Sequence, residues 1–241
     1  MKDYAIIFDP RLKKLASSLS KISEAPAYQA GTNVVYDRYM VLWSYRTNYE
    51  QERTKLERIL KELNDSGYIE VLLLLPGPYQ KGGDQSKFME EMAGFDFVGR
   101  IIFFDLTPVS KIGLTPRPSV NLSAIPTLIK FLKENGIKTK VMTFNSELTT
   151  QAKIIESSVG KSDDSVLLID NYVDDPEKYI PILETYKEKG IKTYLFSTFF
   201  AFSPEAVSGM AQVITTNAIA WDKVITLDIS SAIAEFVDAV S

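Results

Sequence analysis

Residues 167–179 read LLIDNYVDDPEKY and contain a boundary between two kinds of secondary structure. An apolar run stops abruptly at Asp170, acidic residues follow as far as Asp175, and a helical pattern begins near Pro176. Apolar runs buried on both faces are typical of parallel strands, and strands that alternate with helices define the α/β class. The stretch therefore predicts a buried strand, an acidic turn and a helix in an α/β protein.

Strand-length apolar runs and amphipathic helices alternate along the rest of the chain. A helix is predicted within residues 47–65, where apolar residues recur at helical spacing. Two further helices end at Gly136 and Gly190, and glycine is common directly after a helix C-terminus. The predicted strands are residues 4–8, 39–43, 71–75, 101–104, 140–144, 166–170, 193–197 and 224–227. We expect Val71–Leu75 and Val166–Ile169 to be central strands of parallel sheets.

One stretch indicates how the chain divides into domains. Residues 106–123, LTPVSKIGLTPRPSVNLS, are rich in proline, serine and threonine and have no periodicity. Such a composition is typical of a segment that joins two domains. The same succession of strand, helix and strand occurs on both sides of it. We therefore expect two similar α/β domains, residues 1–120 and 121–241, each a mostly parallel sheet flanked by helices.

The composition excludes several classes of chemistry and of partner. The 241 residues include no cysteine and no histidine, which excludes disulfides, thiolate metal sites and catalytic pairs that need histidine. A net charge of −4 without a long basic stretch argues against a nucleic-acid surface. The longest apolar run, Val71–Leu75, is far too short to cross a bilayer, and the N-terminal run is too short for a signal peptide. We expect a soluble cytoplasmic protein.

The acidic turn after the strand at 166–170 has two interpretations. As a ligand site, Asp170 and Asp174 would hold ribose hydroxyls or Mg²⁺, beside a helix N-terminus whose free N–H groups attract anions. As a structural turn, Asp174 or Asp175 would cap the following helix. The turn has no glycine, and Asp175 and Glu177 would repel a phosphate, so the residues favour the structural interpretation.

Two other strand ends carry candidate residues. The loop 76–87 follows an apolar strand and offers Lys81, Asp84 and Lys87 to a polyanion; its alternative role is to connect a strand to a helix at 85–93. Asp105 ends the strand at 101–104, where it either caps a turn or binds a metal ion.

Several segments of the chain occur in a characteristic order. They are VLLLLP (71–76), IIFFDL (101–106), SVNL (119–122), IPTLIKFLKENG (125–136), VLLIDN (166–171), ILETYKEKGIKTYLFSTFFAFSPEAV (182–207), VITTNAI (213–219) and KVITLDISSAIAEFV (223–237). This order resembles that of the ribose-phosphate pyrophosphokinases over nearly the whole chain. The resemblance implies two type I phosphoribosyltransferase-like domains in tandem and assembly into dimers and hexamers.

The resemblance also identifies a degraded ribose-phosphate loop. The family's loop reads Asp-Asp-x-x-Asp-Thr-Ala-Gly-Thr after its strand. Asp170 and Asp174 match the first and last acids, Asn171 replaces the second acid, and residues 175–178 (DPEK) replace Thr-Ala-Gly-Thr. The glycine that would let the backbone surround a phosphate is therefore missing.

The other motifs of the family are also altered. Its histidine near the magnesium ion falls on Thr107, after the matching Asp105, and its nucleotide-binding Arg-Gln-Asp falls on Gly82, Gly83 and Asp84. The pyrophosphate loop, Asp-x-Gly-Gly, falls on residues 145–148 (NSEL). About thirty residues, which in the family carry a strand and the catalytic flap, are missing between Gly160 and Asp164.

These losses predict a catalytically inactive homologue that acts as a regulatory or structural partner, either of an active paralogue or as a homo-oligomer. Two alternatives stay open. One is an active ribose-phosphate pyrophosphokinase or phosphoribosyltransferase-type enzyme, with Mg²⁺ held at Asp105 and Asp170. The other is a sensor that binds a nucleotide or ribose phosphate without turnover.

Overall fold

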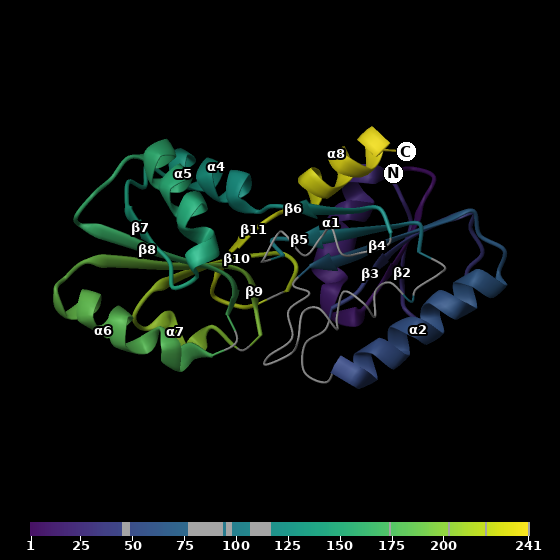
Figure 1. Ribbon diagram of the computed structural model, residues 1–241, viewed down its shortest axis with the longest axis horizontal. Coiled ribbons are helices and arrows are strands. Elements are labelled where there is room, and N and C mark those ends of the chain that lie inside the picture. The colour runs from purple at the N-terminus through teal and green to yellow at the C-terminus, as the bar shows by residue number, and fades with distance from the viewer. Residues whose placement is uncertain are drawn as a thin grey trace. The chain divides into compact units, whose positions relative to one another are not determined.

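The computed structural model describes residues 1–44, 49–76, 94, 98–106, 117–173, 175–201, 203–219 and 221–240 (Figure 1). The chain forms two compact units. The first comprises Met1–Leu122, Ala218–Ala220 and Asp228–Ser241, and the second comprises Ser123–Asn217 and Trp221–Leu227. Each unit contains one parallel sheet flanked by helices, which confirms the predicted α/β fold.

The sheet of the first unit has six parallel strands in the order β2-β1-β3-β4-β5-β6. The strands are β1 (Ala5–Phe8), β2 (Ala27–Gln29), β3 (Arg38–Leu42), β4 (Glu70–Pro76), β5 (Arg100–Phe104) and β6 (Ser119–Leu122). β4 lies between β3 and β5 and is buried from Val71 to Pro76, as expected of a central strand.

Helices cover both faces of this sheet. A short 3-10 turn (Pro10–Leu12) leads into α1 (Lys13–Ser23), which packs against the last helix, α8 (Ser230–Val240). On the other face lies α2 (Tyr49–Asp65) (Figure 1). The apolar stripe of α2 packs against alternate residues of the strands, as its spacing predicts. The stripe consists of Leu56, Ile59, Leu60 and Leu63.

The sheet of the second unit has five parallel strands in the order β11-β10-β9-β8-β7. The strands are β7 (Lys140–Met142), β8 (Ser165–Val173), β9 (Lys192–Phe200), β10 (Gln212–Thr216) and β11 (Ile225–Leu227). α4 (Ile125–Glu134) and α5 (Thr149–Val159) cover one face, and α6 (Ile180–Glu188) and α7 (Glu205–Ser208) cover the other (Figure 1). Short 3-10 turns occur at Ser146–Leu148 and Pro176–Lys178.

Two helix ends have the geometry that the sequence predicts. Gly136 and Gly190 follow α4 and α6 with φ of 63° and 68°, in the left-handed region that glycine adopts most readily. In each case the glycine N–H donates to a carbonyl of the last helical turn, Lys133 O and Lys187 O respectively.

The chain differs from the expected domain division at two places. Ser119–Leu122, expected in a linker, forms the edge strand β6, which pairs with β5 and is only half-buried. α8, expected in the C-terminal domain, belongs by its contacts to the first unit, because it buries Ile233, Ala234 and Val237 against a surface that includes α1.

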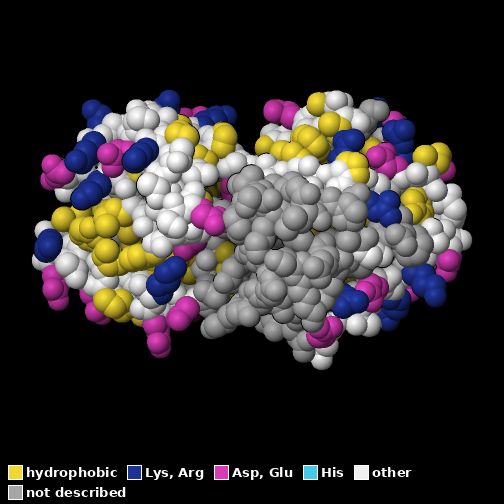
Figure 2. All heavy atoms as spheres, in the orientation of Figure 1, with side chains coloured by type: hydrophobic (Ala, Val, Ile, Leu, Met, Phe, Trp, Pro, Cys, Tyr) yellow, Lys and Arg dark blue, Asp and Glu magenta, His cyan; other side chains and the backbone are white. Residues whose placement is uncertain are grey.

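The surface carries charges of both signs. On the face shown in Figure 2, basic and acidic side chains intermingle over the described residues. No helix in the described part of the chain is long and apolar enough to span a membrane.

Candidate functional site

Asp170 lies within β8, not at its end. The strand was expected to stop at Asp170, but β8 continues to Val173 because Tyr172 and Val173 pair with Phe199 and Phe200 of β9. Stacking of the Tyr172 and Phe199 rings, 5.5 Å apart, supports this extension. As a result Asp170 is buried, with 6% of its surface exposed, and the neighbouring Asn171 is buried as well.

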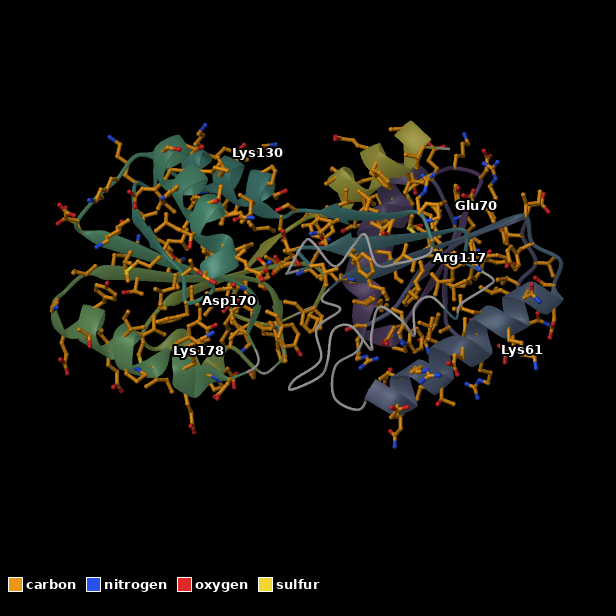
Figure 3. The ribbon with its side chains drawn as sticks, in the orientation of Figure 1. Lys61, Glu70, Arg117, Lys130, Asp170 and Lys178 are labelled. Carbon is orange, nitrogen blue, oxygen red and sulfur yellow. The ribbon has the colours of Figure 1, made fainter. Side chains whose placement is uncertain are left out.

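The buried carboxylate of Asp170 has three donors close by. The hydroxyl of Tyr179 donates to Oδ2 at 2.6 Å, the ammonium of Lys178 lies 3.3 Å from the same oxygen, and the N–H of Asn171 donates to Oδ1 at 2.9 Å. Figure 3 shows Asp170 and Lys178 close together in the second unit. A carboxylate offers about four acceptor positions, so most of those on Asp170 are occupied by the protein itself.

Two aromatic rings complete this group of side chains. Phe144, which follows β7, meets Tyr179 edge to face with ring centroids 5.6 Å apart. The ammonium of Lys178 lies 5.5 Å from the centroid of Phe144 and 5.3 Å from that of Tyr179, within range of cation–π attraction. We call Phe144, Asp170, Lys178 and Tyr179 the Asp170 cluster. It holds Lys178 over the carboxylate by ionic and aromatic contacts together.

The turn that follows β8 is a capped 3-10 turn. The Asp175 carboxylate accepts a hydrogen bond from the N–H of Glu177 at 3.0 Å, which confirms for Asp175 the predicted helix cap. The helix expected over 176–189 is divided, because Pro176–Lys178 form the 3-10 turn and α6 begins only at Ile180. Asp174 lies outside the described residues.

Of the remaining candidate residues, only Asp105 lies within the described residues. Lys81 and Asp84, most of their loop and the helix expected at 85–93 lie outside the described residues, as do Gly82, Gly83 and Thr107. Asp105 belongs to the first unit, whereas Asp170 belongs to the second. Asp105 follows β5 with a left-handed φ of 49°, and its N–H donates to Leu122 O at 2.8 Å.

The described residues do not offer a fitting magnesium site. No group of three or more aspartate and glutamate side chains within them is close enough to hold a metal ion. The ammonium of Lys178, 3.3 Å from Asp170 Oδ2, would repel a divalent ion bound to the same oxygen. We therefore assign no metal-dependent step to Asp170.

A second polar group, which the sequence analysis did not identify, lies at the carboxyl end of β1. Arg11 donates through Nε to Asp9 at 2.8 Å and through a terminal nitrogen to Glu52 Oε2 at 2.6 Å and Ser44 O at 2.8 Å. Asp9 and Glu52 are 2% and 7% exposed. Burial alone would lower the pKa of Arg11, but hydrogen bonds and charge from Asp9 and Glu52 outweigh it and raise that pKa.

We call Asp9, Arg11 and Glu52 the Arg11 network. It lines one side of an open cavity of about 450 Å³, with Trp43 and Lys55 also in the wall. The indole N–H of Trp43 and the hydroxyl of Ser44 are buried and have no hydrogen-bond partner among the described residues. The only local signal in the sequence was Asp9-Pro10 at the end of an apolar run, and Glu52 lies 41 positions away from Arg11.

Comparison with known proteins supports the fold. No family model matches the chain, and no curated protein sequence does so either. The structure is similar to the crystal structure of phosphoribosylpyrophosphate synthetase from Mycobacterium smegmatis, with a TM-score of 0.80. The match covers 99% of this chain and 98% of that chain at 16% sequence identity. The chain therefore has a fold like that of phosphoribosylpyrophosphate synthetase, as the resemblance in its segments predicts.

Proposed function

We propose that this protein is a non-catalytic homologue of ribose-phosphate pyrophosphokinase, and that it acts as a regulatory or structural partner in nucleotide biosynthesis. The observation that carries the proposal is the enclosure of Asp170. Its carboxylate, at the place where the resemblance puts the ribose-phosphate loop, is satisfied by Tyr179, Lys178 and the backbone of Asn171. These three contacts leave a ribose hydroxyl about one of the roughly four acceptor positions of the carboxylate.

The backbone of the turn offers little to a phosphate. Pro176 has no N–H, and the N–H of Glu177 is taken by the side chain of Asp175. The side chains of Asp175 and Glu177 add negative charge where a phosphate would sit. A phosphate cradle needs several free amides aimed at one point, and glycine is the residue that most easily allows this.

A further argument comes from the length of one connection. Residues 160–164 lead directly from α5 to β8, where the resemblance implies about thirty more residues with a catalytic flap. Diphosphoryl transfer depends mainly on positioning and charge neutralisation, and removing one such donor typically costs about 10²–10³ in rate. The joint loss of the flap, the glycine-rich loop and the histidine would therefore bring the rate down by several such factors.

The test is direct measurement of the reaction. We expect no AMP release above a heat-treated control when the full chain is incubated with ATP, ribose 5-phosphate and Mg²⁺. Release that is abolished in the Asp170→Ala variant would show an active enzyme and overturn the proposal. Assembly is tested separately, by light scattering of the purified chain alone and mixed with an active paralogue. The oligomeric state and the cytoplasmic location stay predictions.

A second candidate function, ligand sensing without turnover, is favoured by the cavity beside the Arg11 network. Buried polar groups without a partner are uncommon, and Trp43 and Ser44 provide two of them next to or within its wall. Ligands of parallel sheets bind outside the carboxyl ends of strands, and the cavity lies beyond β1 and β3. Stabilisation of the native state by ATP, ADP, ribose 5-phosphate or phosphate in a thermal-shift assay, without AMP release, would support this function.

A further inference from the structure

The amino ends of three strands in the second unit surround an open pocket of about 710 Å³. Lys192 begins β9, Gln212 begins β10 and Ile225 begins β11, and all three residues line the pocket. Asp170 lies near the other end of the same sheet, so this pocket is separate from the Asp170 cluster. It therefore goes beyond the function proposed above.

Among the described residues, the pocket is lined by cations and by no carboxylate. Three lysines contribute to its wall: Lys187 from the last turn of α6, Lys192 from β9, and Lys223 from the segment before β11. None of these three lysines forms an ion pair with another described residue, and this includes Asp222, the sequence neighbour of Lys223. Elsewhere in this unit, Lys130 and Lys178 do have acidic partners.

Helix termini account for only part of this charge. α6 and α7 both end at the pocket, and a helix C-terminus carries about half a negative charge, so the two offset roughly one lysine. Lys187 therefore has an ordinary structural explanation. Lys192 and Lys223 lie outside helices, and the ammonium of Lys192 lies 5.1 Å from the ring centroid of Tyr194, within range of cation–π attraction.

The lining of the pocket also includes apolar side chains. Met210, Val224 and Ile225 are half-buried at its wall, and the side chain of Gln212 is exposed beside them. Ligand pockets of several hundred Å³ usually combine an apolar surface with a few polar or charged groups that fix the orientation of the ligand. Here the charged groups are all positive, so the ligand must carry concentrated negative charge together with an apolar body.

We propose that this pocket binds a small molecule that carries a di- or triphosphate on an apolar or aromatic body. Three ammonium groups from separate elements match a chain of phosphates better than a single phosphate, because each lysine donates as a point charge to its own group of oxygens. The half-buried apolar residues would contact the body of the ligand.

Titration calorimetry of the full chain without Mg²⁺ tests the proposal, with ATP, tripolyphosphate and adenosine as probes. We expect ATP to bind more tightly than tripolyphosphate, and adenosine to bind far more weakly than either. Each of Lys187→Gln, Lys192→Gln and Lys223→Gln should weaken ATP binding by about fivefold, the range expected of an exposed ion pair. The triple variant should lose roughly 100-fold.

The matched control is Lys130→Gln, an exposed lysine on α4 that is labelled in Figure 3 and does not line the pocket. It should leave ATP binding unchanged. These lysines are exposed, so their replacement is not expected to unfold the chain. Binding that the triple variant retains would overturn the proposal. Tighter binding of polyglutamate than of tripolyphosphate would also overturn it, because the pocket would then be a site for an acidic protein segment.

Discussion

A buried aspartate lies near the carboxyl end of β8 and another just after β1, and the two carboxylates are compensated by different partners. Asp170 of β8 is satisfied by the neutral hydroxyl of Tyr179 and by Lys178, whose side chain is 46% exposed. Asp9, after β1, is paired with Arg11, which also serves a second buried carboxylate, Glu52. Protein groups occupy most of the acceptor positions of Asp170, whereas the Arg11 network borders a cavity.

This difference predicts how strongly the stability of the protein depends on the cation at each site. A buried charge that loses its only counter-charge suffers a large desolvation penalty, whereas an exposed cation contributes little because solvent screens it. Stability should therefore depend strongly on Arg11 and weakly on Lys178. The contribution of the Tyr179 hydroxyl to stability should lie between those of Arg11 and Lys178.

The largest effect is expected from Arg11→Met, which leaves the buried Asp9 without its cation and leaves Glu52 with only the half-exposed Lys55, 3.2 Å away. We expect the free energy of unfolding to fall by about 3–5 kcal/mol in a urea titration. Arg58→Met is the control, because the side chain of Arg58 is 71% exposed and its contact with Glu62 is long, at 3.8 Å. This control should change stability by at most about 0.5 kcal/mol.

The same network offers a sharper test. If uncompensated charge causes the loss, then adding Asp9→Asn and Glu52→Gln to Arg11→Met should recover much of the stability, because neutral amides cost less to bury. A triple variant that is no more stable than Arg11→Met would show that packing of the arginine side chain, and not its charge, stabilises this region.

Tyr179→Phe should have the next largest effect. It removes only the hydroxyl that donates to Asp170 Oδ2, and a hydrogen bond to a charged group contributes about 1.5–3 kcal/mol. In Tyr186→Phe the lost hydroxyl is one that, among the described residues, donates only to the sulfur of Met142, a weak acceptor, so little change is expected. Equal stability of the two variants would contradict the role assigned to Tyr179.

Asp175→Ala tests the cap of the turn after β8. Loss of the hydrogen bond to the N–H of Glu177 should destabilise the chain by about 1 kcal/mol, as for other helix caps. Asp175→Asn keeps an acceptor oxygen and should retain most of the stability. If Asn were as harmful as Ala, the negative charge at the turn and not the hydrogen bond would be the important property.

The smallest effect is expected from Lys178→Met. The ammonium is partly exposed, and its ion pair with Asp170 should contribute about 0.5 kcal/mol, less in high salt. Chemical denaturation in urea at low and high NaCl measures both values. If Lys178→Met lowered the free energy of unfolding as much as Arg11→Met, the predicted difference between the two strand ends would be wrong.

The strands that the sequence predicted correctly are those that form a continuous run of apolar residues. Val71–Leu75 is buried on both faces of a sheet, so its apolar run is continuous. Such a run can be recognised without knowing which strands pair with it. β2 and β6 were not predicted because they are short edge strands with half-exposed, partly polar sequences. β10 was also missed: its sequence, QVITT, is a short run with a polar residue at each end.

The candidate site was predictable only in its local part. The position of Asp170 in a buried strand and the capping role of Asp175 follow from neighbouring residues. The hydrogen bond from Tyr179 depends on the 3-10 turn that delays α6, and the sequence predicted a continuous helix there. The Arg11 network joins residues 41 positions apart, a pairing that no local pattern of charge or spacing specifies.

The position of α8 has a consequence for the order in which the chain can fold on the ribosome. β6 ends at Leu122 and α8 begins at Ser230, so the helix that completes the first unit is synthesised more than a hundred residues after its sheet. At about 5–20 residues per second this delay is roughly 5–20 seconds. The last strand of the second unit, β11, ends at Leu227, before α8 begins. The unit that is made later can therefore close first, while the surface of α1 that α8 will cover stays open to chaperones.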